Sequence, residues 1–411
     1  MSVRIAIVAE SFPPDVNGVA HCALRVAEHL VLRGHQPMVI APAPARDTPG
    51  GAGGTGPLPW PVVRLPSVPL PRYRSFRIGL PIRHLHTALA SHRAELVHLA
   101  SPFVLGSSAV AAAGRERLPT VAVYQTDVPA YARVYRAGKL GEAAAWRWLH
   151  RIHNAADRTL APSAASAASL REHGVQRVWL WGRGVDTERF DPARRSPRLR
   201  HQLAPGGEVL VGYVGRLAPE KRVDLLWQVA GLPGVRLVIV GDGPAGAALR
   251  RALPGAVFLG ARHGTELAAI YASLDVFVHS GACETFGQTL QEAAASGLPV
   301  VAPAAGGPLD LVDHGRTGYL VAPGDAGALA GAVARLASSP QLRLTMGQAG
   351  RQQTMGRSWR ALGDQLIGHY SAVLGGPWPP LPPGLPVRAG AAARPRGPAG
   401  SRAGEGAGVA R

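Results

Sequence analysis

The stretch GACETFGQTLQEAAASGLPVVA, residues 281–302, joins a helix to a strand and indicates the fold class of the whole chain. Thr285 and Gln288 match a capping box, which predicts that a helix starts here. No helix breaker follows until Gly297, which stands where a carboxyl-terminal cap belongs. An apolar strand is predicted at 299–302. A helix that runs directly into a short apolar strand is typical of an α/β fold with a parallel sheet.

Two carboxylates lie on either side of this helix start. Glu284 should precede the helix, and Glu292 should lie inside it. Amides at a helix start point outward and the dipole there favours negative charge, so Phe286, Gly287 and Gln288 suit a diphosphate. Glu292, about two turns further along at ~1.5 Å per residue, can then accept from ribose hydroxyls while Glu284 faces a sugar. The alternative is that both acids merely complement the helix dipole.

The alternation of short apolar runs with helical patterns occurs twice along the chain. The first half has a predicted helix at 20–33 and predicted strands at 4–9, 37–41, 96–99, 120–124 and 158–161. After an Arg- and Pro-rich link, strands are predicted at 209–214, 236–240, 257–259, 276–278 and 299–302. Repeated βαβ order predicts parallel sheets. The fold expected is therefore α/β, with two domains whose strand ends face a shared cleft.

The length of 411 residues suits two domains, which we place at 1–190 and 191–357. The last segment, 375–411, has 17 Gly or Pro among its 37 residues and is predicted to be disordered. It holds five arginines and one acid, so most of the basic excess belongs to the folded part.

The formal net charge is +18, with 42 arginines and only two lysines, Lys139 and Lys221. Such a charge favours anionic partners: nucleotides, nucleic acid or acidic lipid. Nucleic acid is disfavoured, because no reader motif is present and aromatic residues make up only 6%. Between Thr48 and Ala94 the chain has six arginines and no acid. This segment is either a solvated loop or a surface that meets anionic lipid or acceptor headgroups.

The two cysteines, Cys22 and Cys283, form neither a disulfide framework nor a metal-binding spacing, and no metal is expected. Cys283 is interpreted as a packing residue rather than a nucleophile. The first apolar run ends at Glu10 and is too short for a signal peptide, and no run of about 18 uncharged apolar residues occurs. We therefore expect a cytoplasmic protein without a membrane span.

Glycine-bearing turns follow two of the predicted strands. Gly18 comes after the first strand and lets backbone approach a phosphate closely. Gly215 precedes Arg216, and Lys221 follows five residues later, so both cations are within reach of one diphosphate. The alternative for Lys221 is an ordinary solvated side chain.

The run GDGPAG, residues 241–246, includes Gly243 and matches the dinucleotide fingerprint. It does not follow the first strand of its domain, so we interpret it as a tight strand-to-helix turn that lines the cleft. The sequence contains no P-loop of the ATPase type and no nucleophile elbow.

Taken together, these features resemble the retaining glycosyltransferases of family 4, whose GT-B fold has two Rossmann-like domains facing each other across a cleft. The resemblance covers residues 3–374. It rests on Glu284 and Glu292 as an E-x7-E pair, Gly215-Arg216 with Lys221, Gly241-Asp-Gly243-Pro, Gly184-Val-Asp186 with Phe190, and Asn17-Gly18.

The resemblance implies a role for each residue. Glu284 would contact donor-sugar hydroxyls, Glu292 would hold the ribose, and the amides of 286–288 would bind the sugar and diphosphate. Arg216 and Lys221 would neutralise the leaving diphosphate, which itself takes the acceptor's proton in a front-face route. The resemblance also implies that a final helix, 358–374, returns to the first domain.

A narrower resemblance comes from Val123-Tyr-Gln-Thr-Asp127 and His98-Leu-Ala-Ser-Pro-Phe103. Both are similar to actinobacterial GDP-mannose-dependent α-mannosyltransferases that act on lipid acceptors, which implies that Asp127 belongs to the donor site. Many relatives carry His where this chain has Gln125. An amide cannot act as an acid or base near neutral pH.

The implied function is transfer of a hexose, with mannose from GDP-mannose favoured, to a hydroxyl of a lipid or glycolipid acceptor. No tightly bound cofactor is expected. The expected partners are a nucleotide sugar, a glycan or lipid acceptor and an anionic membrane surface on the cytoplasmic side. Alternatives are UDP-glucose or another donor with a soluble acceptor, a nucleotide-sugar epimerase, or a phosphorylase. A phosphorylase would need pyridoxal phosphate on Lys139 or Lys221.

Overall fold

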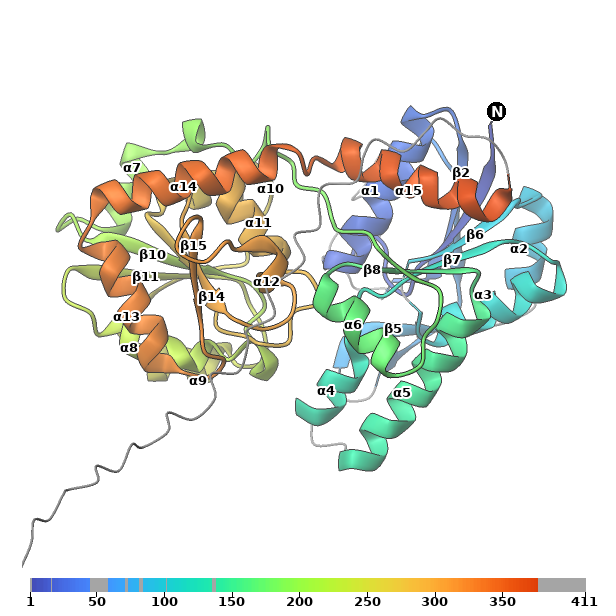
Figure 1. Ribbon diagram of the computed structural model, residues 1–411, viewed down its shortest axis with the longest axis horizontal. Helices are drawn as coiled ribbons and strands as arrows, with labels where there is room; N and C mark the ends of the chain where they lie inside the picture. Colours follow the sequence, from blue (N-terminus) through green and yellow to red (C-terminus); the bar gives the residue numbers. More distant parts are fainter. Residues whose placement is uncertain are drawn as a thin grey trace, which may run out of the picture.

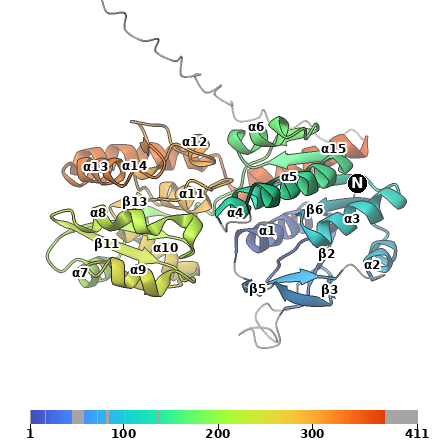
Figure 2. The ribbon, with the colours of Figure 1, turned by 90° about the horizontal axis from the view of Figure 1, so that it is seen from below.

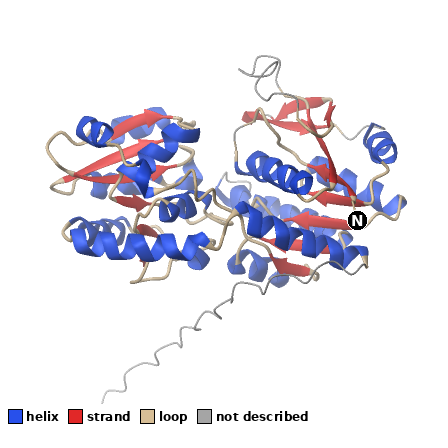
Figure 3. Cartoon of the chain, turned by 90° about the horizontal axis from the view of Figure 1, so that it is seen from above, coloured by secondary structure: helices blue, strands red, loops and turns tan. Residues whose placement is uncertain are grey.

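The structure is a computed structural model that describes residues 2–15, 17–44, 58–70, 73–80, 84–100, 102–134 and 138–375. Two α/β domains lie side by side, each with its strands between layers of helices (Figures 1 and 3). The α/β class predicted from the alternating pattern is confirmed. The predicted tail at 376–411 lies outside the described residues.

The first domain is built on a parallel sheet with the strand order β3-β2-β1-β6-β7-β8-β9. Its strands are β1 (Arg4–Val8), β2 (Gln36–Pro42), β3 (Val62–Leu65), β6 (Leu96–Leu99), β7 (Thr120–Val123), β8 (Arg158–Ala161) and β9 (Val178–Leu180). Its helices are α1 (Gly18–Leu32), α2 (His84–His92), α3 (Val104–Arg115), α4 (Val128–Val134), α5 (Gly138–Ala155) and α6 (Ala164–Glu172). β6 and β7 are buried along their whole length, as expected when helices cover both faces of a parallel sheet.

The second domain has a parallel sheet with the order β12-β11-β10-β13-β14-β15. Its strands are β10 (Val209–Val214), β11 (Val235–Val240), β12 (Val257–Gly260), β13 (Val276–Val278), β14 (Val300–Pro303) and β15 (Gly318–Val321). Its α-helices are α7 (Pro197–Leu203), α8 (Trp227–Ala230), α9 (Gly246–Ala252), α10 (Gly264–Ser273), α11 (Gln288–Ala295), α12 (Pro308–Leu311), α13 (Ala326–Ala337) and α14 (Pro340–Met355). Short 3-10 helices are η1 (Pro192–Arg194), η2 (Pro219–Lys221) and η3 (Val223–Leu226).

The acid-free stretch at 48–94 is not a simple loop. Its described residues include β3, α2 and an antiparallel hairpin of β4 (Ser67–Leu70) with β5 (Tyr73–Gly79), beside the first sheet (Figure 2). Arg64 donates to the carbonyl of Pro42 at 3.1 Å, and Arg77 donates to the hydroxyl of Ser67 at 2.7 Å. Two of the six arginines therefore make hydrogen bonds within the domain. Arg72 and Arg83 lie outside the described residues.

Helix α15 (Trp359–Leu374) leaves the second domain and packs beside α1 (Figure 1). Its residues Leu362, Leu366 and Tyr370 belong to the core of the first domain. The indole N–H of Trp181 donates to the carbonyl of Leu362 at 2.8 Å. By contrast, Phe190 packs in the core of the second domain. The core of the first domain is thus completed by a helix that follows the whole second domain in the chain.

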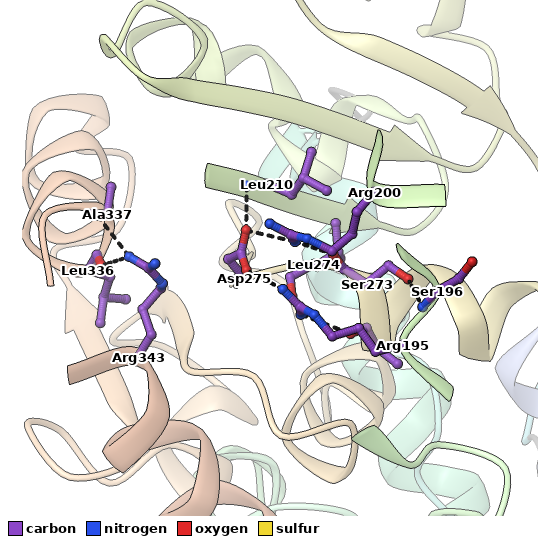
Figure 4. A network of polar contacts seen from close by, with 11 residues as sticks. Arg195, Ser196, Arg200, Leu210, Ser273, Leu274, Asp275, Leu336, Ala337 and Arg343 are labelled. Carbon is purple, nitrogen blue, oxygen red and sulfur yellow. Dashed lines mark hydrogen bonds and ion pairs between the residues drawn. The ribbon is translucent and has the colours of Figure 1, made fainter. Parts of the chain in front are cut away.

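A polar network ties the link between the domains to the second sheet (Figure 4). Asp275 accepts from the amide of Leu210 at 2.9 Å, from Arg195 at 3.0 Å and from Arg200 at 2.9 Å. Arg200 also donates to the carbonyl of Ser273 at 2.7 Å. The link that follows the first domain is therefore fixed to the start of β10 and the end of α10.

Candidate functional site

The carboxyl ends of strands from both sheets meet at the junction between the domains. Gln125 follows β7, and its carbonyl accepts from the hydroxyl of Thr285 in the second domain at 3.1 Å. The carbonyl of Thr285 in turn accepts from the hydroxyl of Ser166 at 3.3 Å. In open α/β sheets, ligands bind outside the carboxyl ends of the strands. The junction is therefore the candidate site.

Two glycine turns in the second domain pack backbone against backbone at this edge. A Cβ added to Gly241 would lie 1.9 Å from the carbonyl oxygen of Gly215, and one added to Gly243 would lie 2.4 Å from that of Leu217. Gly243 has φ of 154°, in the region that favours glycine. The run at 241–246 is thus a tight turn from β11 into α9.

Lys221, at the end of η2, forms an ion pair with Glu284, and the two side chains are only 17% and 16% exposed. His279 lies 3.5 Å from the same carboxylate. Burial alone would raise the pKa of Glu284, but Lys221 and His279 bring that pKa below its ordinary value. Burial likewise opposes the charge of Lys221, but Glu284 raises the pKa of the ammonium. Both groups are therefore charged at neutral pH.

Arg216 lies beside a different carboxylate. It forms an ion pair with Glu220, which is buried at 2% exposure, and its own carbonyl accepts from the hydroxyl of Tyr213 at 3.1 Å. Each of the two predicted cations is thus matched by its own acid. Glu220 was not among the predicted site residues, because an acid beside a lysine in a turn looks like an ordinary surface residue.

The predicted capping box at α11 is wrong. The helix begins at Gln288, its N-cap is Gly287 with φ of 100°, and Thr285 makes no capping hydrogen bond. The Thr285 hydroxyl instead donates to the backbone carbonyl of Gln125, and the side-chain amide of Gln288 donates to the carbonyl of Gly184 at 3.1 Å. Both side chains serve contacts across the junction, so the glycine makes the turn into the helix. The predicted glycine at the other end is correct, since Gly297 has φ of 77°.

Glu292 lies inside α11, as predicted, and accepts from the hydroxyl of Tyr271 at 3.2 Å. Burial raises the pKa of Glu292 to about 7, although hydrogen bonds from Tyr271 and Gln288 oppose the rise. Phe286 points into the second core and is 4% exposed. What this residue offers the junction is therefore its backbone rather than its ring.

Gly18 is the first residue of α1, where the side chain of Asn17 caps the amides of Val19 and Ala20 at 3.0 and 2.9 Å. A Cβ added to Gly18 would lie 2.8 Å from a guanidinium nitrogen of Arg183. This glycine lets a charged side chain approach the start of α1 closely.

Asp127 accepts from the amide of Ala130 at 2.9 Å and so begins α4. Burial raises the pKa of Cys283, and the charge of Asp127 adds to that rise. A thiol whose pKa is raised is a poor nucleophile, in agreement with the packing role expected for Cys283.

Arg183, His279 and Gln291 belong to the junction but were not predicted from the sequence. The guanidinium of Arg183 donates to the side-chain oxygen of Gln125 at 2.9 Å, and Gln291 donates to the carbonyl of Arg183 at 2.9 Å. The available signal was the run Gly182-Arg183-Gly184, in which two glycines flank one cation.

A cavity of about 430 Å³ lies elsewhere, lined by residues that include Thr120, Asp157 and Arg158. Thr120 and Arg158 begin β7 and β8, so this cavity is at the opposite end of the first sheet from the junction. In the described part of the chain, no three His, Cys, Asp or Glu side chains gather as a metal site. None of the described helices is both long and apolar enough to cross a membrane.

Two family models match the chain. One described as Glycosyltransferase Family 4 matches residues 16–189, and one described as Glycosyl transferases group 1 matches residues 196–353. A GDP-mannose-dependent alpha-mannosyltransferase of Mycobacterium tuberculosis is 50% identical over 91% of this chain and 97% of that protein. One of Corynebacterium glutamicum is 44% identical over 90% of this chain and 89% of that protein.

The arrangement of both domains is also found in solved structures. The sucrose-phosphate synthase of Thermosynechococcus elongatus has a TM-score of 0.75 at 23% identity, covering 91% of this chain and 99% of that one. HepE from Anabaena, in complex with UDP and glucose, has a TM-score of 0.72 at 22% identity, covering 90% of this chain and 100% of that one. At this level of identity the likeness concerns the fold.

Proposed function

Because the chain belongs to family 4 of the glycosyltransferases and has the GT-B fold, we propose that it transfers mannose from GDP-mannose to an acceptor hydroxyl with retention of configuration. The chain is a glycosyltransferase. Relatives that are 44–50% identical and carry the name GDP-mannose-dependent alpha-mannosyltransferase support the donor.

The observation that carries the proposal is the Lys221–Glu284 ion pair in front of α11. As the bond from C1 of the sugar to the phosphate breaks, its electron pair moves to the diphosphate, where negative charge grows. We infer that Lys221, Arg216 and the amides at the start of α11 stabilise that charge, a role supported by the closeness of Lys221 to Glu284 in front of this helix. Glu284 accepts hydrogen bonds from the sugar, and Glu292 lies further along the same helix for the ribose.

The transfer balances without a carboxylate nucleophile. The acceptor oxygen forms the new bond to C1 on the face that the phosphate leaves, and its proton passes to a leaving phosphate oxygen. Before the donor binds, the raised pKa of Lys221 and the lowered pKa of Glu284 favour the charged form of both groups. This scheme differs from that of retaining hydrolases, in which one of two carboxylates attacks C1.

A donor screen tests the proposal. Purified protein is incubated with GDP-mannose, UDP-glucose and UDP-N-acetylglucosamine, and release of nucleotide and sugar is followed with and without acceptor. Turnover of GDP-mannose above the other two is expected, with the α-anomer as the transferred product by NMR. Preference for UDP-glucose would contradict the donor, and a β-linked product would contradict retention.

We further propose that the acceptor is lipid-linked and that α5 faces an anionic membrane. Its exposed face carries Lys139, Leu140, Arg147, Trp148 and Arg151, and Leu140 and Trp148 are 87% and 40% exposed. With α4, this helix extends from the lower edge of the first domain (Figure 1). Basic residues near anionic lipid contribute about 1 kcal/mol each.

Vesicle sedimentation tests the membrane contact. Wild-type protein should bind phosphatidylglycerol vesicles and leave phosphatidylcholine vesicles unbound. Joint replacement Leu140→Ser and Trp148→Ser should weaken binding, whereas Leu344→Ser, an exposed leucine of the second domain, should not. Equal binding of all three proteins, or equal activity on a soluble sugar without vesicles, would contradict this part of the proposal.

A further inference from the structure

We propose that Arg183 is a catalytic residue whose guanidinium contacts the phosphate that carries the hexose, and that Gln125 positions it there. This inference rests on the proposed function only in requiring a diphosphate donor.

Arg183 lies in the segment that joins the two domains, and both of them hold it. Its backbone carbonyl accepts from Gln291 at 2.9 Å, and the next carbonyl, that of Gly184, accepts from Gln288 at 3.1 Å. Both donors belong to α11. Its guanidinium reaches the other way, to Gln125 of the first domain at 2.9 Å. Arg183 thus connects α11, through its backbone carbonyl, with the end of β7, through its side chain.

The guanidinium also faces the groups expected around the reacting bond. One nitrogen would lie 2.8 Å from a Cβ on Gly18, at the start of α1, where helix geometry favours an anion. The positive charge of Arg183 also affects the pKa of Glu284. Burial raises the pKa of that acid, whereas Lys221, His279 and Arg183 all lower it. The guanidinium of Arg183 therefore lies beside the start of α1, and its charge favours the ionised form of the acid proposed to bind the hexose.

Gln125 is built to hold this cation without neutralising it. It is 5% exposed, and its amide nitrogen donates to the carbonyl of Ala100 at the end of β6. That bond fixes the orientation of the amide and turns its oxygen toward Arg183. A carboxylate here would cancel the guanidinium charge, and an amide cannot supply a proton. A permanent cation held by a neutral amide therefore provides the charge at this position.

The planar guanidinium of Arg183 suits a phosphate because it offers several N–H donors in one plane. One nitrogen is held by Gln125, which leaves the other to face Gly18. When the bond from C1 to the phosphate breaks, the electron pair moves onto that phosphate, next to the guanidinium. The acceptor's proton then passes to a phosphate oxygen, and Arg183 itself exchanges no proton.

Kinetics of Arg183→Ala and Arg183→Lys test the role. We expect Arg183→Ala to lower kcat about 100-fold for both transfer and acceptor-free donor hydrolysis, and to weaken GDP binding. Arg183→Lys should be faster than Arg183→Ala but slower than wild type, because lysine keeps the positive charge and lacks the planar set of donors. Low guanidinium chloride should rescue Arg183→Ala, whereas urea should not. Arg316→Ala, with a side chain that is 61% exposed, is the matched control.

A double-variant cycle tests Gln125. Gln125→Ala should lower kcat about tenfold by misplacing the guanidinium. The double variant with Arg183→Ala should be no slower than Arg183→Ala alone, because Gln125 acts only through Arg183. Independent, multiplying losses would show that Gln125 is merely structural and would overturn its positioning role.

Other outcomes would overturn the assignment of Arg183. A raised KM for the acceptor with normal donor hydrolysis would place it against an anionic acceptor instead. If wild-type protein turned over no nucleotide sugar, the proposed function would fail, and GDP titration would still decide about Arg183. Equal GDP affinity of wild type and Arg183→Ala would then refute the phosphate contact.

Discussion

Replacing Lys221 by Met should separate the catalytic role of the ammonium from its structural one. Loss of one preorganised stabiliser of transition-state charge typically costs about 2.7–4 kcal/mol. Since about 1.4 kcal/mol corresponds to tenfold in rate, kcat should fall about 100- to 1000-fold. Met keeps much of the side-chain volume, so the loss reports the charge rather than a cavity.

The same replacement should also destabilise the protein, because it leaves Glu284 buried without its partner. Breaking a buried ion pair in this way typically costs about 3–5 kcal/mol. In wild-type protein the pKa of Glu284 is lowered, so its stability contribution is present above the ordinary pKa and is lost as pH falls through the lowered one. Without Lys221, burial raises that pKa, and stability should instead fall as pH rises.

Calorimetric Tm between pH 5 and 8 and steady-state kcat are the two measurements. The double variant Lys221→Met, Glu284→Gln should recover Tm, because no unpaired charge is buried, yet remain slow. Near-normal turnover of Lys221→Met would refute the assigned role. Recovery of turnover together with Tm in the double variant would show that the pair is only structural.

Three further predictions follow from other parts of the structure. Burial raises the pKa of Glu292 to about 7, so wild-type protein should bind GDP more tightly as pH rises from 6 to 8, and isothermal titration of Glu292→Gln should show no such pH dependence. Because the pKa is raised in the folded state, the stability contribution of Glu292 should be fully present below about pH 4.5 and be lost as pH rises through about 7. Asp275→Ala should lower the free energy of unfolding by about 3 kcal/mol in urea titrations, because it removes the carboxylate that accepts from the Leu210 amide and pairs with two arginines. Arg195→Ala, whose side chain is 44% exposed, should cost no more than about 1 kcal/mol. Gly184→Ala places a Cβ 2.4 Å from Trp359 Cα, so lower Tm and lower kcat are both expected; an unchanged protein by both measures would contradict the packing at the junction.

Most of the strands that sequence patterns predicted are buried by helices on both faces, although the predicted edge strand β12 is only partly buried. β7 and β14 are buried throughout, so they read as uninterrupted apolar runs. Two of the strands that were not predicted, β9 and β15, are short and partly exposed. β9 has three residues, of which two are exposed, and β15 begins at a glycine. Such segments pair because of their place at the edge of a sheet, which no local pattern records.

The candidate site was predictable where it rests on local runs and not where distant segments meet. Glu284, Lys221 and Glu292 could be chosen from spacing alone. The partnership of Arg183 with Gln125 joins residues 58 positions apart, so no local pattern records it. The capping box failed for the same reason, because contacts across the junction took both of its side chains.

The return of α15 to the first domain has a consequence for the order in which the protein is made. The ribosome completes the first sheet early, but Leu362, Leu366 and Tyr370 of its core emerge only after the whole second domain. Domains generally fold as units during synthesis, the amino-terminal one first. Here the second domain can fold before the first is complete. Until α15 emerges, the nascent first domain exposes the apolar surface beside α1 that this helix later covers.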